Sequence, residues 1–241
     1  MKYALVTGGS RGIGKAISCH LAQQGFYVLI NYRSAHEEAQ KVKAEIEQEG
    51  GQAELLPFDV SDPQKVEEVL GGWMKQNDKY IDVLVNNAGI TSDNLMVFMS
   101  NEEWNKVIST NQNSFFFVTR QVLEGMIVSK WGRIINLVSL SGQKGHPGQV
   151  NYSASKGAVM AATKSLAMEV GKKKVTVNCV APGFIKTEMT ENISEKDWKR
   201  HIPLNRFGKA EEVASVVGFL ASEGAAYITG ETIAVNGGMY S

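Results

Sequence analysis

The stretch Thr7-Gly8-Gly9-Ser10-Arg11-Gly12-Ile13-Gly14 follows a short apolar run, Tyr3 to Val6, and precedes an amphipathic segment that extends to Ala22. This order predicts a strand, a glycine-rich turn and a helix, because glycine lets the backbone turn tightly. Free N–H groups at the start of a helix favour a bound anion such as a pyrophosphate. A flexible surface turn is the alternative, but the place of the loop between a strand and a helix disfavours it. The residues expected to line a bound dinucleotide here are Gly8, Ser10, Arg11, Gly12, Ile13 and Gly14.

Short β-branched runs alternate with longer amphipathic segments along the rest of the chain. These runs are YALV (3–6), FYVLINY (26–32), AELLPF (53–58), IDVLVNN (81–87), RIINLVS (133–139), VTVNCVA (175–181) and ETIAVN (231–236). Nearly continuous apolar strands separated by helices are typical of a parallel sheet covered on both faces. We therefore expect one α/β domain over residues 1–241, a Rossmann-like, doubly wound parallel sheet of about seven strands. Its ligand should bind at the carboxyl ends of the strands.

Composition disfavours several classes of partner. Lys plus Arg and Asp plus Glu both total 25 in 241 residues, so no basic excess favours nucleic acid. The first apolar run is too short for a signal or membrane-spanning segment. The two cysteines, Cys19 and Cys179, lie in apolar segments as packing residues. We expect a cytoplasmic protein that acts on small molecules, without a nucleic-acid, membrane or metal partner.

The end of the second predicted strand decides between NAD and NADP. In dinucleotide-binding folds an acidic residue there binds the ribose 2′-hydroxyl, and its charge repels a 2′-phosphate. This chain has Asn31-Tyr32-Arg33 instead, and no carboxylate appears before Glu37. Arg33 and Arg11 are suited to face a phosphate, so the sequence favours NADPH. Either arginine alone also fits an ordinary surface charge.

Tyr152 and Lys156 form a Tyr-x-x-x-Lys pattern in a helical segment, and the i, i+4 spacing places both side chains on one face. An ammonium beside a phenol lowers the phenol pKa from its usual value of about 10. Tyr152 is then suited to protonate a ketone oxygen while nicotinamide supplies hydride, and Lys156 to bind the ribose hydroxyls. By itself the pattern also fits a tyrosine at the edge of the core beside a solvated lysine.

Two further polar residues support the catalytic interpretation. Ser139 ends the predicted strand RIINLVS, where a hydroxyl faces a ligand at the carboxyl edge of the sheet. Ser141, in the loop beyond, is a weaker candidate. Asn111 lies in a long helical segment, although asparagine is a mediocre helix former. We expect Asn111 to hold a water or a backbone group near Lys156, with a solvated helix-surface amide as the alternative.

With these residues in place, the chain resembles the short-chain dehydrogenases/reductases, and within them the bacterial 3-oxoacyl-acyl-carrier-protein reductases. The motifs are Thr7-Gly8-x-x-x-Gly12-x-Gly14, Asp59-Val60, Asn86-Asn87-Ala88-Gly89, Asn111, Ser139, Tyr152-x-x-x-Lys156 and Pro182-Gly183. The resemblance implies NADPH-dependent reduction of a 3-oxoacyl thioester to the 3-hydroxyacyl thioester in fatty acid biosynthesis. It also implies cofactor contacts at Asp59, Val60, Asn86, Ala88, Gly89, Pro182, Gly183, Ile185 and Thr187.

The resemblance also implies partners. Basic residues that dock an acyl carrier protein match Lys130 and Lys173 here, although Lys173 also fits a cation at a helix C-terminus. The helices around residues 102–130 and 153–171 carry broad apolar faces, and the resemblance implies that such faces join the subunits of a homotetramer. The alternative is that these faces simply cover the sheet.

Segments around the expected substrate mouth depart from regular alternation or from the family pattern. Residues 183–202 are long, polar and follow a Pro-Gly turn, which predicts a mobile flap over the pocket. Phe98, Val138 and Asn205 differ from the residues usual in the family and predict a reshaped substrate mouth.

Other functions remain open at this stage. An acetoacetyl-coenzyme A reductase shares all of these features. An NAD-dependent dehydrogenase of secondary alcohols, sugars or steroids is disfavoured only by Asn31-Tyr32-Arg33. A regulatory module that binds NADPH without turnover is disfavoured by the complete set of catalytic residue types.

Overall fold

The computed structural model describes residues 1–240, and its centre is one all-parallel sheet of seven strands in the order β3-β2-β1-β4-β5-β6-β7. The strands are β1 (Tyr3–Val6), β2 (Tyr27–Tyr32), β3 (Gln52–Pro57), β4 (Val83–Asn86), β5 (Gly132–Leu137), β6 (Val175–Pro182) and β7 (Thr232–Val235). The predicted doubly wound parallel sheet is confirmed, and each predicted strand end lies within two residues of the observed one.

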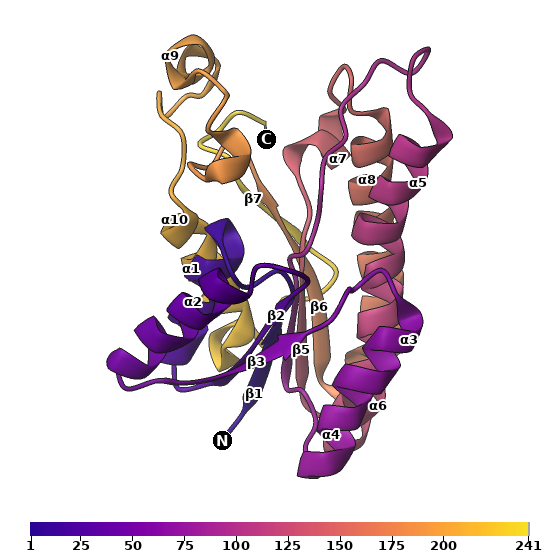
Figure 1. The fold of residues 1–241 in the computed structure, drawn as a ribbon, viewed down its shortest axis with the longest axis vertical. Coiled ribbons are helices and arrows are strands. Elements are labelled where there is room, and N and C mark those ends of the chain that lie inside the picture. Colours follow the sequence, from indigo (N-terminus) through magenta and orange to yellow (C-terminus); the bar gives the residue numbers. More distant parts are fainter. Residues whose placement is uncertain (241) are drawn as a thin grey trace.

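Helices cover both faces of the sheet (Figure 1). One face carries α1 (Gly12–Gln23), α2 (His36–Gln48) and α10 (Ala210–Ala221). The other carries α3 (Pro63–Lys65) with α4 (Gly72–Asn77), α5 (Asn101–Ile108), α6 (Ser114–Ser129) and α8 (Val150–Val170). The alternation of strand side chains produces this arrangement, because Ala4 and Val6 of β1 enter one apolar cluster while Leu5 enters the other. No helix in the described part of the chain is long and apolar enough to cross a membrane.

The position of β1 between β2 and β4 creates the crevice in which parallel sheets of this kind bind ligands. The chain leaves β1 toward one neighbour and returns on the other side, so the connections diverge above the carboxyl ends of the strands. Hydrogen bonds fix the two sides of this crevice to each other. The Thr7 hydroxyl accepts from the backbone N–H groups of Asn87 and Ala88, at 2.9 and 3.0 Å.

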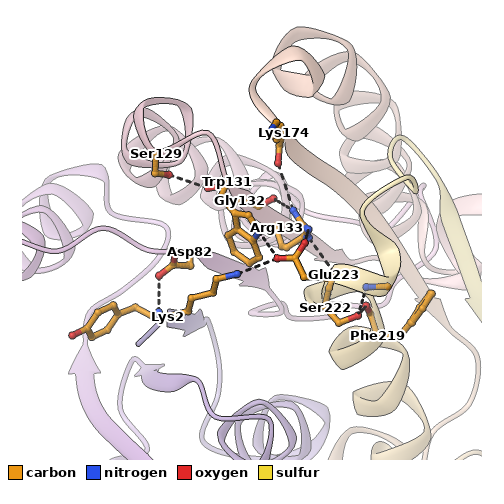
Figure 2. A network of polar contacts seen from close by, with 12 residues as sticks. Lys2, Asp82, Ser129, Trp131, Gly132, Arg133, Lys174, Phe219, Ser222 and Glu223 are labelled. Carbon is orange, nitrogen blue, oxygen red and sulfur yellow. Dashed lines mark hydrogen bonds and ion pairs between the residues drawn. The ribbon is translucent and has the colours of Figure 1, made fainter.

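At the amino ends of the strands, opposite the crevice, a network of polar contacts surrounds Arg133 near the start of β5 (Figure 2). The Arg133 side chain is 2 % exposed and its guanidinium donates to three backbone carbonyls, those of Gly132, Lys174 and Ser222. It also pairs with Glu223 at 3.4 Å. These contacts connect β5 to the segments before β6 and after α10.

An aromatic ring completes this network. The Trp131 ring lies between two cations, 3.2 Å from Lys2 Nζ and 4.4 Å from Arg133 Cζ, measured to the ring centroid. Its indole N–H donates to Glu223 at 2.7 Å. Cation–π contacts contribute most where the cation is desolvated, as Arg133 is here.

We expect Arg133→Ala to lower the free energy of unfolding by about 3 kcal/mol, because three carbonyls lose a charged donor and buried packing is lost. Lys2→Ala, at the exposed end of the stack, should cost less than about 1 kcal/mol. Urea unfolding followed by circular dichroism measures both variants. Equal effects of the two substitutions would show that the buried guanidinium contributes nothing beyond the surface contact.

Candidate active site

A cavity of about 540 Å³ opens at the carboxyl ends of the strands beside the crevice between β1 and β4. It brings together most of the cofactor-binding residues that the sequence predicts. These are Gly8, Ser10, Arg11, Gly12, Ile13, Gly14, Asn31, Tyr32, Arg33, Asp59, Val60, Ala88, Gly89, Tyr152, Lys156, Pro182 and Thr187. The cavity also passes Met189, in the segment predicted to form a flap.

Three predicted cofactor contacts do not line this cavity. The Asn86 carboxamide is turned into the protein, where it donates to Thr119 and Asn136 at 3.1 and 2.8 Å. Gly183 lies against Asn236, and a Cβ on it would approach the Asn236 Cβ to 2.8 Å. Ile185 is 3 % exposed and belongs to the apolar core.

Asn87 lines the cavity, although the predicted cofactor contacts named only its neighbours Asn86, Ala88 and Gly89. Its side-chain amide donates to the carbonyls of Thr7 and Gly8 at 2.9 and 3.1 Å, so it holds the glycine-rich loop against the end of β4. Strand alternation was the available signal, because consecutive residues at a strand end point to opposite faces. Asn86 and Asn87 therefore cannot both face the ligand.

The glycine-rich loop has the close backbone approach that a bound pyrophosphate requires. A Cβ on Gly14 would lie 2.1 Å from the carbonyl oxygen of Gly8, and Gly8 and Gly12 have positive φ angles of 62° and 52°. Helix α1 starts after Arg11, and no side chain of the described residues caps its first N–H groups. These unpaired donors at a helix N-terminus fit the phosphates of a dinucleotide.

Two arginines stand at the outer part of the cavity, each near one carboxylate. Arg33 Nη1 lies 3.7 Å from Asp59 Oδ2, and Arg11 Nε lies 3.7 Å from Glu188 Oε2. The Arg33 and Arg11 side chains are 60 % and 68 % exposed. Burial raises the pKa of Asp59, but hydrogen bonds from Ser61 and the Arg33 charge outweigh it, so that pKa is lowered. Asp59 is thus an anion that holds Arg33 at the cavity.

Tyr152 and Lys156 both face the cavity from α8, as the i, i+4 spacing predicts. Lys156 is 5 % exposed, and its Nζ donates to the carbonyl of Leu137 at 2.8 Å. The Nζ lies 5.7 Å from the centroid of the Tyr152 ring. Burial lowers the pKa of Lys156 to about 8.

The pKa of the Tyr152 phenol differs from the sequence expectation. Burial raises it, while a hydrogen bond with Ser139 acts in the opposite direction and is the weaker effect. The sequence predicted that the Lys156 ammonium brings the pKa of Tyr152 below its usual value. That prediction was wrong, because the pKa is raised. The reason is desolvation, which disfavours the phenolate and the ammonium at the same time.

Ser139 lies beside Tyr152 but in a different element from the one expected. Strand β5 ends at Leu137, and Ser139 is the N-cap of α7 (Leu140–Lys144), where its hydroxyl accepts from the Ser141 N–H at 3.1 Å. Ser141, expected in a loop, lies in α7. Its hydroxyl donates to Gln149 at 2.9 Å.

Asn111 lies in a π-helical turn, Ser109–Asn113, between α5 and α6. π-helical turns often mark functional sites. Its side chain is paired with the backbone of Ile90, accepting from the N–H at 2.8 Å and donating to the carbonyl at 2.9 Å. Asn111 is 4 % exposed, which excludes the solvated-amide alternative and agrees with the expected backbone contact. A Cβ on Gly89 would lie 3.3 Å from both Asn111 Oδ1 and Lys156 Nζ, so these polar groups meet around Gly89.

The segment 183–202 forms short helical turns, including α9 (Glu195–Trp198), beyond the carboxyl ends of the strands (Figure 1). Its residues Thr187, Glu188 and Met189 line the cavity. Rings of Phe184 and Trp198 lie 5.0 Å apart, and the Trp198 ring also lies 6.0 Å from that of His146, between α7 and α8. Asn205 has a positive φ of 54°, which asparagine tolerates better than most residues other than glycine.

The fold and the cavity define a Rossmann-type protein with a dinucleotide site and a Tyr–Lys pair beside it. A family model described as "Enoyl-(Acyl carrier protein) reductase" matches residues 8–240. The chain belongs to the short-chain dehydrogenase/reductase family, whose members are oxidoreductases.

Curated relatives of nearly equal length support the assignment. A 3-oxoacyl-[acyl-carrier-protein] reductase of Pseudomonas aeruginosa is 47 % identical over 99 % of this chain and 97 % of its own length. One from Synechocystis is also 47 % identical, over 98 % of this chain and 96 % of its own length. Among solved structures, a putative gluconate dehydrogenase from Agrobacterium tumefaciens superposes with a TM-score of 0.95 at 30 % identity, covering 99 % of this chain and 95 % of that one.

We expect Gly14→Ala to weaken binding of NADH and NADPH by roughly tenfold or more, because the new methyl group would displace the Gly8 carbonyl and the turn around it. Titration of protein fluorescence with each dinucleotide measures this. Gly72→Ala is the control, since a Cβ there meets nothing within 4 Å. Unchanged affinity in Gly14→Ala would separate this loop from the dinucleotide site.

Proposed function

We propose that the protein reduces 3-oxoacyl thioesters to 3-hydroxyacyl thioesters with NADPH, in fatty acid biosynthesis. The observation that carries the proposal is the half-buried phenol of Tyr152, whose pKa lies above its ordinary value, beside Ser139 and a cavity suited to a dinucleotide. A phenol that stays protonated at neutral pH is a proton donor, which is what ketone reduction needs.

The proposed chemistry divides between cofactor and protein. Reduced nicotinamide, when bound, supplies a hydride to the carbonyl carbon of the substrate. Tyr152 donates its proton to the carbonyl oxygen, and the Ser139 hydroxyl donates a hydrogen bond to the same oxygen. As the phenol loses its proton, the ammonium of Lys156 stabilises the developing phenolate. Asn111 holds the Ile90 backbone beside Lys156.

The preference for NADPH is supported by charge. Asn31 and Tyr32 are uncharged and almost fully buried, while the exposed guanidinium of Arg33 stands at the cavity where a 2′-phosphate would lie. Arg11 adds a second positive charge from the glycine-rich loop. A phosphate would compete with Asp59 and Glu188 for these two arginines.

The proposed substrate follows the names of the relatives, which act on acyl groups of the acyl carrier protein. Lys130 at the end of α6 and Lys173 after α8 are exposed cations suited to an acidic carrier. Lysine retains the charge of an arginine but not its two-pronged hydrogen bonding. Coenzyme A thioesters are the alternative substrates that the same site accommodates.

A cytoplasmic homotetramer is part of the proposal. Phe116 on α6 and Met168 on α8 are 52 % and 86 % exposed, and Tyr227 after α10 is fully exposed. Large apolar side chains exposed on neighbouring helices favour burial against further copies of the chain.

We expect wild-type protein to oxidise NADPH with acetoacetyl thioesters of carrier protein, coenzyme A and a short pantetheine mimic, and Tyr152→Phe to lower kcat by roughly 10²- to 10⁴-fold. Tyr27→Phe, which removes a phenol hydroxyl at the amino end of β2 and outside the cavity lining, is the control. NADPH absorbance at 340 nm follows each reaction. Reduction of a sugar acid, a steroid ketone or an enoyl thioester, with every 3-oxo thioester untouched, would refute the substrate assignment.

We expect Arg33→Asp to shift the ratio of kcat/KM for NADPH over NADH by about tenfold or more toward NADH, because the new carboxylate repels a 2′-phosphate. Lys41→Asp makes the same charge change on α2, away from the cavity lining. Steady-state kinetics with both cofactors measures the ratio. A ratio that moves equally in both variants would assign the effect to net charge alone.

A further inference from the structure

A buried line of polar side chains crosses the sheet beneath the cavity, and the proposed reaction leaves it without a role. Asn136 of β5 is fully buried, and its amide donates to the Thr163 hydroxyl of α8 at 2.8 Å. Cys179 of β6 also approaches that hydroxyl, with its Sγ at 3.1 Å. On the other side, Asn136 accepts from Asn86 of β4, which in turn contacts Thr119 of α6.

This line of side chains includes a bond between β5 and α8, the same two elements that the hydrogen bond from Lys156 to Leu137 joins. Lys156 Nζ donates to the carbonyl of Leu137, the residue that follows Asn136 in β5. Thr163 follows Lys156 by seven residues in α8. Seven residues make about two helical turns, or about 10.5 Å along the helix axis in total, so both side chains face the sheet. One contact alone fixes a single point of a helix. Two contacts on one face, two turns apart, fix its rotation and its axial position.

Polar side chains at these positions are not the most stable choice for an apolar layer. Ile134 lies on the same face of β5 as Asn136, Val177 lies on that face of the neighbouring β6, and both are fully buried. Replacing a buried polar pair by packed apolar side chains is often neutral or stabilising. A satisfied buried pair instead selects one arrangement over neighbouring ones. The pair therefore contributes more to the register of α8 on β5 than to stability.

We propose that Asn136 and Thr163 are positioning residues, whose hydrogen bond sets the place of α8 on β5 and thereby the place of the Lys156 ammonium beside Tyr152. The inference rests on the proposed function, because it assigns these residues an effect on the same proton transfer. Neither residue lines the cavity. Both act through Lys156.

The test compares two threonines that differ in the helix they hold. Thr163→Val keeps the shape of the side chain and removes the hydroxyl on α8, whereas Thr163→Ser retains it. Thr119→Val is the matched control, since Thr119 is 4 % exposed and accepts from Asn86 in the same line but belongs to α6. Asn136→Leu removes the bond from the strand side.

We expect Thr163→Val and Asn136→Leu to lower kcat by roughly 10- to 100-fold with little change in KM for the thioester, because a displacement near 1 Å is enough for such a loss. Thr163→Ser should retain at least about half of kcat, and Thr119→Val should stay within about twofold. The double variant Asn136→Leu/Thr163→Val should lose no more than Asn136→Leu alone, because the bond that Thr163→Val removes is already absent there.

The titration of Lys156 gives a readout that a merely structural role would not move. Burial lowers its pKa to about 8, and the described titratable groups near it are Tyr152 on α8 and Cys179 on β6. The charged form is present below that pH, so kcat/KM should fall as pH rises through it. In Thr163→Val we expect the Lys156 ammonium to be less buried, so its pKa should be higher than in the wild-type protein. Lysine-labelled NMR follows this shift in the protein without cofactor.

The outcomes separate this inference from the proposed function. If wild-type protein reduces thioesters but Thr163→Val keeps its kcat and its Lys156 titration, the positioning role is refuted and the function stands. Equal losses in Thr163→Val and Thr119→Val, matched to their losses in melting temperature, would also refute it. If no thioester is reduced, the NMR titration still decides the role of the pair.

Discussion

The burial of the Lys156 ammonium is the constraint on which the structure at the carboxyl ends of the strands depends. Taking an ammonium out of water is costly unless polar groups replace the water, and Lys156 is 5 % exposed. The Leu137 carbonyl accepts a hydrogen bond from Lys156 Nζ at 2.8 Å, which requires β5 to end at the level of the lysine. Gly89 lies within reach of the same Nζ because it carries no side chain. The ends of β4 and β5 and the start of α8 thus converge on a single charge.

This constraint also explains why the phenol behaves differently from the sequence expectation. The expectation considered only the attraction between Tyr152 and Lys156, which favours the phenolate. Burial acts on both groups and favours the neutral form of each, so the pKa of Tyr152 rises while that of Lys156 falls to about 8. For a reductase this is the useful direction. The phenol keeps its proton in the ground state, and the ammonium stabilises the phenolate only as the proton leaves.

Periodicity and motif spacing predicted the sheet, the glycine-rich loop and the Tyr–Lys face, because each is encoded by residues close together in sequence. Side-chain direction at strand ends was harder, and Asn86 and Asn87 show why: adjacent residues in a strand face opposite sides, and the pattern does not say which. The pairing of Asn136 with Thr163 joins residues 27 apart in different elements. A polar residue in an otherwise apolar strand signals such a partner without naming it. Ser139 was predicted as the last residue of a strand, because the apolar run before it hid its role as the N-cap of the short helix α7.

The amino ends and the carboxyl ends of the strands are stabilised in different ways, and this difference matters for the candidate active site. At the amino ends of the strands, Arg133 joins three segments through charged hydrogen bonds, and no group there faces the cavity. At the carboxyl ends, the polar groups are held by neutral side-chain bonds and by backbone carbonyls, with Arg33 and Arg11 paired at a distance of 3.7 Å. Pairs at that distance between exposed groups contribute little to stability. The carboxylates therefore hold the two arginines only weakly beside the cavity, while the network at the amino ends of the strands holds the sheet that positions them.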